Sequence, residues 1–124
     1  MKAAEYFNNG YSCSESIIME AIEKGLVPEE LLSVATSFSG GMGSGCLCGA
    51  IAGSQMVLGY VLGRSNARVA AKKFIEEFKK NHKATCCRVL TAGLDMASPE
   101  RKAHCTNMVH DCSKILEEMI KVKV

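Results

Sequence analysis

Seven cysteines are the residues of this 124-residue chain most able to do chemistry: Cys13, Cys46, Cys48, Cys86, Cys87, Cys105 and Cys112. No short stretch holds enough of them for a local zinc knuckle, so any shared site must be assembled by folding. Their number is odd, and no secretory leader is evident after Met1-Lys2. We therefore expect a cytoplasmic protein whose thiols are redox-active or metal-binding rather than held in structural disulfides.

Cys48 follows a glycine-rich loop, Ser39–Gly45, and precedes an apolar segment with the composition of a helix. Free backbone N–H groups and the positive dipole end of that helix would favour a thiolate, so we expect a depressed pKa for Cys48. Gly49 would leave the sulfur open to close approach by another group. The alternative is a small, inert cysteine packed against a neighbouring helix. The helix start and the other thiols make us favour the reactive interpretation.

Cys13 and Cys105 each lie in the first two turns of a predicted helix, on its apolar face. Cys112 follows Cys105 by seven residues. That spacing corresponds to about 10 Å along one helix, which is too far for a disulfide between the two. We therefore predict that Cys112 is a core residue.

The remaining cysteines are harder to assign. Cys86 and Cys87 are adjacent, so their side chains diverge on a helix and usually only one of them can point into a given site. Cys46 lies near Cys48 in the loop. It is either a resolving thiol or an ordinary loop residue.

The elements that must position these thiols all have helical periodicity, with no alternating strand pattern longer than four residues. We predict one domain, residues 1–124, that folds as an all-α bundle. Six helical segments should enclose a buried, glycine-rich central helix from about Cys48 to Arg64. Expected helix starts are the capping box Ser12-x-x-Glu15, the turn Pro28-Glu29-Glu30 and Ser98-Pro99-Glu100.

Charge and hydropathy give no support for binding to nucleic acid or for a membrane span. The net charge of +2 gives no argument for nucleic acid or membrane surfaces. Residues 48–63 carry no charge, but their length, their glycines and Gln55 favour a protein core over a membrane span. Residues 64–83 form an amphipathic helix whose outward lysines are Lys72, Lys73, Lys79 and Lys80. We interpret that face as solvated; docking of an acidic redox partner is the alternative.

The order of the cysteines resembles the C_GCAxxG_C_C family. Cys13, the run Cys48-Gly49-Ala50-Ile51-Ala52-Gly53, then Cys87 and Cys105 match its pattern, as do Phe38–Gly43 and Cys87-Arg88-Val89-Leu90. The resemblance covers about nine-tenths of the chain and implies four functional cysteines, Cys13, Cys48, Cys87 and Cys105, with a redox role. It supplies no substrate. Cys46, Cys86 and Cys112 are departures; Cys87 fits the third position better than Cys86 because Arg-x-Leu follows it.

Two hypotheses follow for the four thiols. In the first, they form a dithiol/disulfide centre that exchanges electrons with a partner protein or a small-molecule thiol, with Cys48 as nucleophile. In the second, four thiolates hold an iron–sulfur cluster or a zinc ion. Neither hypothesis defines an enzymatic reaction or an oligomeric state. The three histidines are scattered, and His104 points away from its neighbour Cys105 on a helix, so a Cys–His catalytic pair is not expected.

Overall fold

The computed structural model describes residues 1–95 and 98–123, with side chains through Lys121. Over these residues the chain is all-α, as predicted, and no sheet strand forms there. Its elements are α1 (Ala3–Asn8), α2 (Cys13–Glu23), α3 (Leu31–Thr36), the wide turn η1 (Gly41–Gly45), α4 (Gly49–Leu62), α5 (Arg64–His82), α6 (Cys87–Leu90) and α7 (Pro99–Lys123).

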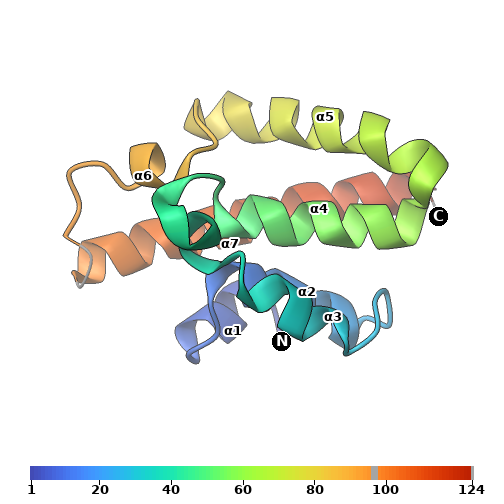
Figure 1. Cartoon of the computed structure of the whole chain (residues 1–124), viewed down its shortest axis with the longest axis horizontal. Helices are drawn as coiled ribbons and strands as arrows, with labels where there is room; N and C mark the ends of the chain where they lie inside the picture. Colours follow the sequence, from blue (N-terminus) through green and yellow to red (C-terminus); the bar gives the residue numbers. More distant parts are fainter. Residues whose placement is uncertain (96–97, 124) are drawn as a thin grey trace.

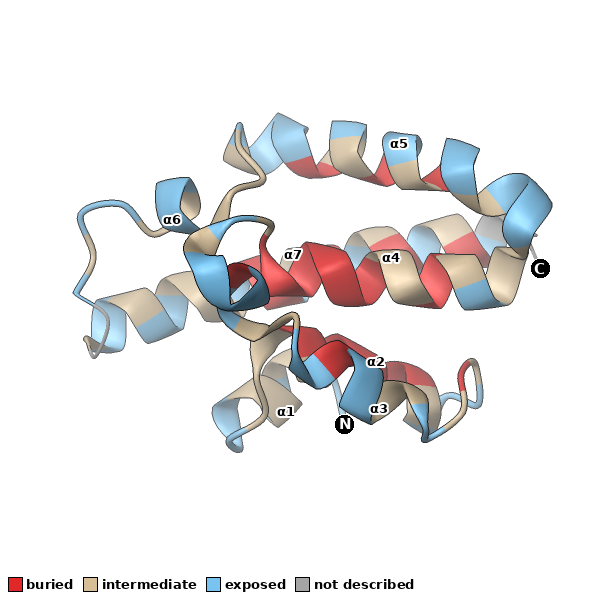
Figure 2. Ribbon diagram, viewed as in Figure 1, coloured by how far each residue is buried: buried red, intermediate tan, exposed pale blue. Residues whose placement is uncertain are grey.

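Helix α4 lies at the centre of the molecule, between α5 on one side and α2 with α3 on the other, while α7 runs behind it (Figure 1). Its first six residues are all buried, and Val57 and Leu58 continue the buried face (Figure 2). The prediction of a buried, glycine-rich central helix is therefore confirmed. The helix ends at Leu62 because Gly63 takes a left-handed φ of 81°, after which α5 begins.

The helix-start patterns are present at two of the three predicted places. The Ser12 hydroxyl accepts a hydrogen bond from the Glu15 N–H (3.2 Å), and the Glu15 carboxylate accepts one from the Ser12 N–H (2.9 Å). Ser98 accepts from the Arg101 N–H at 3.1 Å and so caps α7. The helix predicted to start at Pro28 begins later, at Leu31. The residues after Pro28 instead make a tight turn, in which each backbone hydrogen bond joins residues three positions apart.

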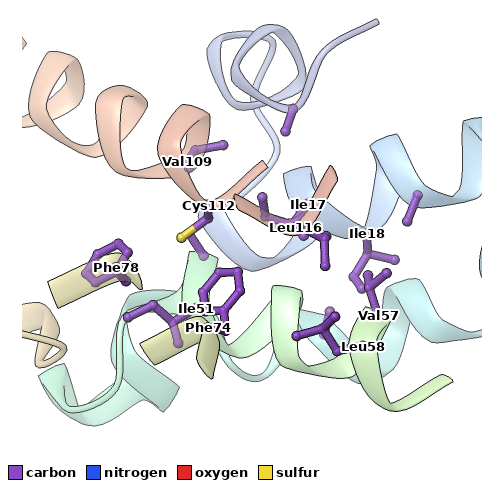
Figure 3. Packing of buried hydrophobic residues seen from close by; sticks show 14 of the residues in the cluster. Ile17, Ile18, Ile51, Val57, Leu58, Phe74, Phe78, Val109, Cys112 and Leu116 are labelled. Carbon is purple, nitrogen blue, oxygen red and sulfur yellow. The ribbon is translucent and has the colours of Figure 1, made fainter. Parts of the chain in front are cut away.

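The core is formed where α2, α4, α5 and α7 meet. Phe74 and Phe78 of α5 and Ile51 of α4 are completely buried. The Cys112 side chain lies in the same cluster (Figure 3), with no exposed surface. The prediction that Cys112 is a core residue is therefore confirmed. Such aromatic side chains bury roughly 150–250 Å² each, so they dominate the packing between α5 and α4.

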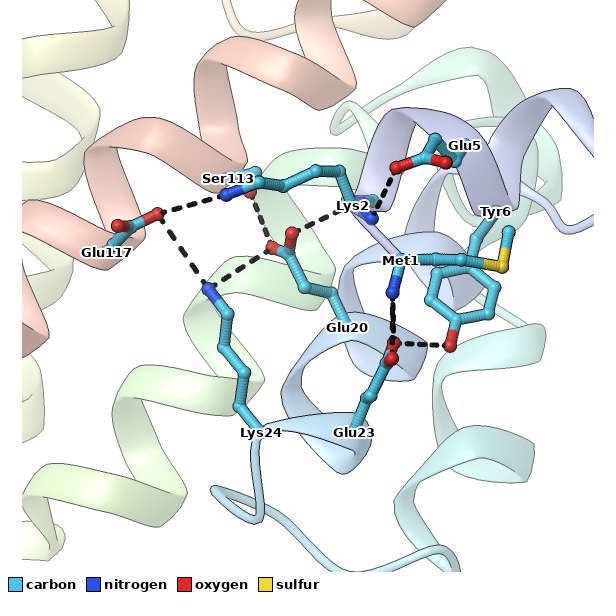
Figure 4. A network of polar contacts seen from close by, with 10 residues as sticks. Met1, Lys2, Glu5, Tyr6, Glu20, Glu23, Lys24, Ser113 and Glu117 are labelled. Atoms are coloured by element: carbon cyan, nitrogen blue, oxygen red, sulfur yellow. Dashed lines mark hydrogen bonds and ion pairs between the residues drawn. The ribbon is translucent and has the colours of Figure 1, made fainter.

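A buried carboxylate ties α1 and α7 to α2 (Figure 4). Glu20 accepts hydrogen bonds from the Ala3 N–H (3.0 Å) and from the Ser113 hydroxyl (2.5 Å). Lys24 lies 3.9 Å from the same carboxylate and 3.7 Å from Glu117. A buried charge is tolerated when it is bonded in this way. The network sets the position of α1 and α7 relative to the C-terminal turn of α2.

The outer face of α5 is solvated, with Lys72, Lys73, Lys79 and Lys80 all exposed. Its inner face carries Ala70, Phe74 and Phe78, as the periodicity predicts. Of the helices described, none combines the length and the apolar character needed to cross a membrane.

Candidate functional site

Four cysteines from four separate segments line one cavity of about 190 Å³. Cys13 begins α2, Cys48 directly precedes α4, Cys87 begins α6, and Cys105 lies in the second turn of α7. The structure thus brings together the four thiols that the sequence singled out. The other lining residues are Phe7, Ser12, Gly40, Gly49, Ala50, Arg101 and Met108.

The glycines of α4 allow Cys13 to reach this cavity. A Cβ atom added at Gly49 would overlap the Cys13 sulfur, and one added at Gly53 would lie 2.8 Å from the Ser14 carbonyl oxygen. Real Cβ atoms essentially never approach other atoms this closely, so a side chain at either position would force the neighbouring atoms of α2 to shift. Since Gly49 and Gly53 are four residues apart, they share one face of α4. The start of α2 therefore packs directly on the α4 backbone, beside Cys48.

Backbone hydrogen bonds hold the Cys48 and Cys87 segments together. The Cys48 N–H donates to the Thr85 carbonyl at 2.8 Å, and the Cys87 N–H donates to the Cys46 carbonyl. Together these bonds form an isolated antiparallel bridge between Leu47 and Cys86. They place two segments about forty residues apart in the chain side by side at the cavity.

The wide turn η1 supports the same junction. Its Gly41 has a left-handed φ of 67°, and a Cβ there would lie 2.9 Å from the Cys87 Cβ. The Cys46 N–H closes the turn on the Gly41 carbonyl at 3.1 Å. Arg88 of α6 donates to the Ser44 carbonyl at 2.8 Å. The glycine-rich loop therefore makes room for Cys87, whereas the sequence indicated only a loop before Cys48.

Arg101 is the cavity residue that sequence reasoning missed. It lies one helical turn before Cys105 on α7, and its side chain lines the cavity together with Cys87, whose pKa it lowers. Its Nε atom is buried without a hydrogen-bond partner among the described residues. The four-residue spacing from Arg101 to Cys105 could have drawn attention to it, since residues so spaced share a helix face.

The pKa of Cys48 is raised to about 12, which overturns the expectation of a depressed value. Burial is the main cause, because the side chain is only 4% exposed and a thiolate would lose its hydration. Backbone N–H groups of Ile51 and Ala50 act in the expected direction and lower the pKa. The helix start therefore has the effect predicted for it, but desolvation outweighs it.

Cys87 and Cys105 are only partly buried, and they share a cationic neighbour. Burial raises the pKa of each thiol, and the neighbouring cavity thiols add to that effect. The Arg101 guanidinium acts in the opposite direction on both. These are the two cavity thiols whose thiolates would be stabilised by a positive charge.

The other three cysteines lie away from the cavity lining. Cys46 is exposed, and the Cys86 thiol donates to the Gly45 carbonyl at 3.1 Å. Burial raises the pKa of Cys112 well above its ordinary value, while the neighbouring Ser54 side chain acts in the opposite direction. Cys87 rather than Cys86 therefore faces the other thiols.

None of the three histidines lines the cavity. His104 lies 2.7 Å from the Leu90 carbonyl, and His82 lies 2.7 Å from the Asp111 carboxylate while stacking on Phe78. His110 is exposed on α7. The residues that the structure describes thus offer no histidine as a base for the cavity thiols.

The arrangement of the four sulfurs bears on the zinc hypothesis. Tetrathiolate zinc needs four sulfurs about 2.3 Å from one point. Among residues 1–95 and 98–121, no three Cys, His, Asp or Glu side chains are arranged to hold a metal ion. The Arg101 guanidinium beside Cys87 would also repel a cation. The four thiols share a cavity, but among the described residues they are not arranged to hold a single metal ion.

One known family profile matches most of the chain. The profile of the family described as "Putative redox-active protein (C_GCAxxG_C_C)" matches residues 11–119, a span that contains all four cavity cysteines. No curated protein and no solved structure matches the chain. With most of its length covered by that profile, the chain belongs to the C_GCAxxG_C_C family.

Proposed function

We propose that this protein is a thiol–disulfide redox protein whose dithiol/disulfide centre is built from Cys13, Cys48, Cys87 and Cys105. The observation that carries the proposal is that the four thiols line one cavity, to which each of four distant segments contributes one thiol. Cysteines kept only for packing would be distributed through the core, as Cys112 is. Family membership supports a redox role without naming a reaction.

The reaction we propose transfers two electrons. A cysteine thiolate attacks one sulfur of a partner disulfide, and a new protein–partner S–S bond forms as the first partner thiolate leaves and takes up a proton. A second protein thiol then loses its proton and attacks the mixed disulfide. The second partner thiol leaves, and the protein retains a disulfide. Two cysteines are oxidised while one partner disulfide is reduced to two thiols.

The cavity suggests different roles for the inner and outer thiols. Cys48 is buried, and its raised pKa keeps it protonated at neutral pH, so it is a poor first nucleophile. We therefore assign the first attack to Cys87 or Cys105, which are more exposed and lie beside Arg101. Cys48 and Cys13 form the inner pair that stores the electrons, because the Cys13 sulfur lies against Gly49, next to Cys48.

Counting thiols through a redox cycle tests the proposal. Oxidation of the reduced protein by a small disulfide should remove thiols in pairs, and a reductant should restore them. Peptide mapping should place the disulfide among the four cavity cysteines. Replacing Cys48 with Ser should abolish the inner disulfide, which forms in a third exchange when Cys48 attacks Cys13 in its disulfide with the outer cysteine and the outer thiolate leaves.

Two matched variants serve as controls. Cys46→Ser changes an exposed thiol close to Cys48, and Cys112→Ser changes a buried thiol outside the cavity. Both should keep the reversible loss of two thiols. Reversible oxidation that survives Cys48→Ser but fails in Cys112→Ser would contradict the proposed centre.

A further inference from the structure

A surface groove of about 750 Å³ adjoins the cysteine cavity between α1 and the first turns of α7. Its volume lies within the range of small-molecule sites. Phe7, Arg101 and Cys105 line both the groove and the cavity. The remaining lining residues are Asn8, Ser98, Pro99, Lys102, Ala103, Thr106 and Asn107.

Cys105 is the cavity thiol that faces this groove. The lining of the groove includes Cys105 but not Cys13, Cys48 or Cys87. A molecule seated in the groove therefore meets the Cys105 sulfur before any other thiol of the centre. Cys105 is therefore the thiol that faces a bound substrate, while Cys13, Cys48 and Cys87 do not line the groove.

The described residues of the groove carry positive charge and no carboxylate. Arg101 contributes a guanidinium whose Nε has no partner among the described residues. Lys102 lies with its Nζ 5.0 Å from the centre of the Phe7 ring and 3.4 Å from the Phe7 carbonyl oxygen. Two amides, Asn8 and Asn107, add neutral hydrogen-bonding groups. An anionic ligand with polar groups complements this lining.

We propose that the groove binds a low-molecular-weight thiol that carries a carboxylate, or the disulfide of such a thiol, and presents its sulfur to Cys105. The proposal rests on the proposed thiol–disulfide function and names its substrate class. The ligand carboxylate is held by Arg101 and Lys102, while its sulfur points to the opening that leads into the cavity.

The exchange then has a defined order. The Cys105 thiolate attacks the ligand disulfide RS–SR, an S–S bond forms between Cys105 and one RS group, and the other leaves as RS⁻ and is protonated. Cys13 or Cys87, which line the same cavity as Cys105, next attacks Cys105. The second RS⁻ leaves, and an intramolecular disulfide remains. One RS–SR becomes two RSH as two protein thiols become one disulfide.

Three disulfides of similar size but different charge test the assignment: dithiodipropionate (anionic), hydroxyethyl disulfide (neutral) and cystamine (cationic). Each oxidation rate is divided by the rate of the same disulfide with a free cysteine peptide, which removes differences in leaving-group reactivity. We expect the normalised rate to be about tenfold higher for the anion than for the cation at low salt. Acid-quenched samples should carry the first adduct on Cys105.

Variants identify which side chains cause the preference for an anionic disulfide. Lys102→Gln and Arg101→Gln should each reduce the anion-to-cation ratio at least about threefold, because each removes one of the two cations. Lys114→Gln, an exposed lysine of the same helix outside the groove, should leave the ratio unchanged. Equal normalised rates for the three disulfides, or a ratio that Lys102→Gln leaves intact, would overturn the groove assignment alone. Absence of reversible oxidation by all three would instead overturn the thiol–disulfide function.

Discussion

Cys48 and Cys105 show how two similar residues acquire different chemistry from their surroundings. Cys48 directly precedes α4, where free backbone N–H groups favour a thiolate, whereas Cys105 lies in the second turn of α7. Cys48 is enclosed by α2 and α4, so its pKa rises to about 12. Cys105 keeps partial exposure and has Arg101 one helical turn away. Burial and a fixed cation therefore decide reactivity, and the position within the helix is secondary.

Arg101→Gln should slow alkylation of Cys105 in the reduced protein. The guanidinium lowers the pKa of Cys105 against the effect of burial, so its loss raises that pKa and reduces the thiolate fraction at neutral pH. We expect a decrease of about three- to tenfold in the rate near pH 7.5, read out by mass spectrometry of labelled peptides. Arg101→Lys should retain part of the rate. An unchanged Cys105 rate in Arg101→Gln would show that the cation does not act on this thiol.

At the scale of single residues, the sequence identified the four cavity cysteines but did not predict how their surroundings shift their pKa values. The order of Cys13, Cys48, Cys87 and Cys105 indicated which thiols to compare. The pKa of Cys48 could not be obtained, because it depends on burial by residues far away in the chain. Arg101 lies within a polar first turn of α7, where an arginine is ordinarily a solvated residue.

Among the elements, the junction of α2 with α4 depends most closely on residue size. Gly49 and Gly53 remove side chains from the α4 face that receives Cys13 and Ser14. Gly59, on the same helix, has no atom within 4 Å of an added Cβ. Substitutions at Gly49 or Gly53, compared with one at Gly59, therefore distinguish the effect of close helix packing from the effect of helix propensity.

Gly49→Ala should destabilise the protein, and Gly59→Ala should stabilise it. At Gly49 the new methyl overlaps the Cys13 sulfur and lies 3.2 Å from the Phe38 carbonyl, which we expect to cost about 1–3 kcal/mol. At Gly59 the methyl meets open space, and the better helix propensity of alanine should add roughly 0.5–1 kcal/mol. Urea unfolding of both variants measures the two free energies. Equal and stabilising effects would show that α2 does not approach α4 this closely.

The elements themselves were largely predictable from local patterns. Capping residues such as Ser12 and Ser98 act within one turn, so their effect is visible in sequence. The wide turn η1 was not foreseen, because it is closed by Cys46 and fitted against Cys87, a residue about forty positions away. The start of α3 was misplaced for a local reason, since Pro28 suits a tight turn as well as a first helical turn.

On the scale of the whole molecule, the buried thiols couple stability to pH. Cys48 and Cys112 are both buried, and burial raises the pKa of each above its ordinary value. The unfolded chain has no such environment, so its thiols ionise at about pH 8.5. At pH values between about 8.5 and the raised pKa of each folded thiol, the unfolded state has released protons that the native state retains. Stability from these two groups is therefore complete below about pH 8.5 and is lost as the pH rises.

The reduced protein should accordingly unfold more readily at pH 10 than at pH 7, and the cysteine variants should separate the contributions. Each buried thiol is expected to account for a loss on the order of 2 kcal/mol over that interval, since about 1.4 kcal/mol is lost per pH unit above the unfolded pKa. Urea unfolding in excess phosphine reductant measures the free energy at each pH. Cys112→Ser should show a smaller fall than the wild type by about that amount, because serine does not ionise there. Cys46→Ser, which removes an exposed thiol, should fall as far as the wild type. If all three proteins lost the same free energy, the Cys112 thiol would not be held in its neutral form by burial, and the tight packing of α7 against α4 would be contradicted at its centre.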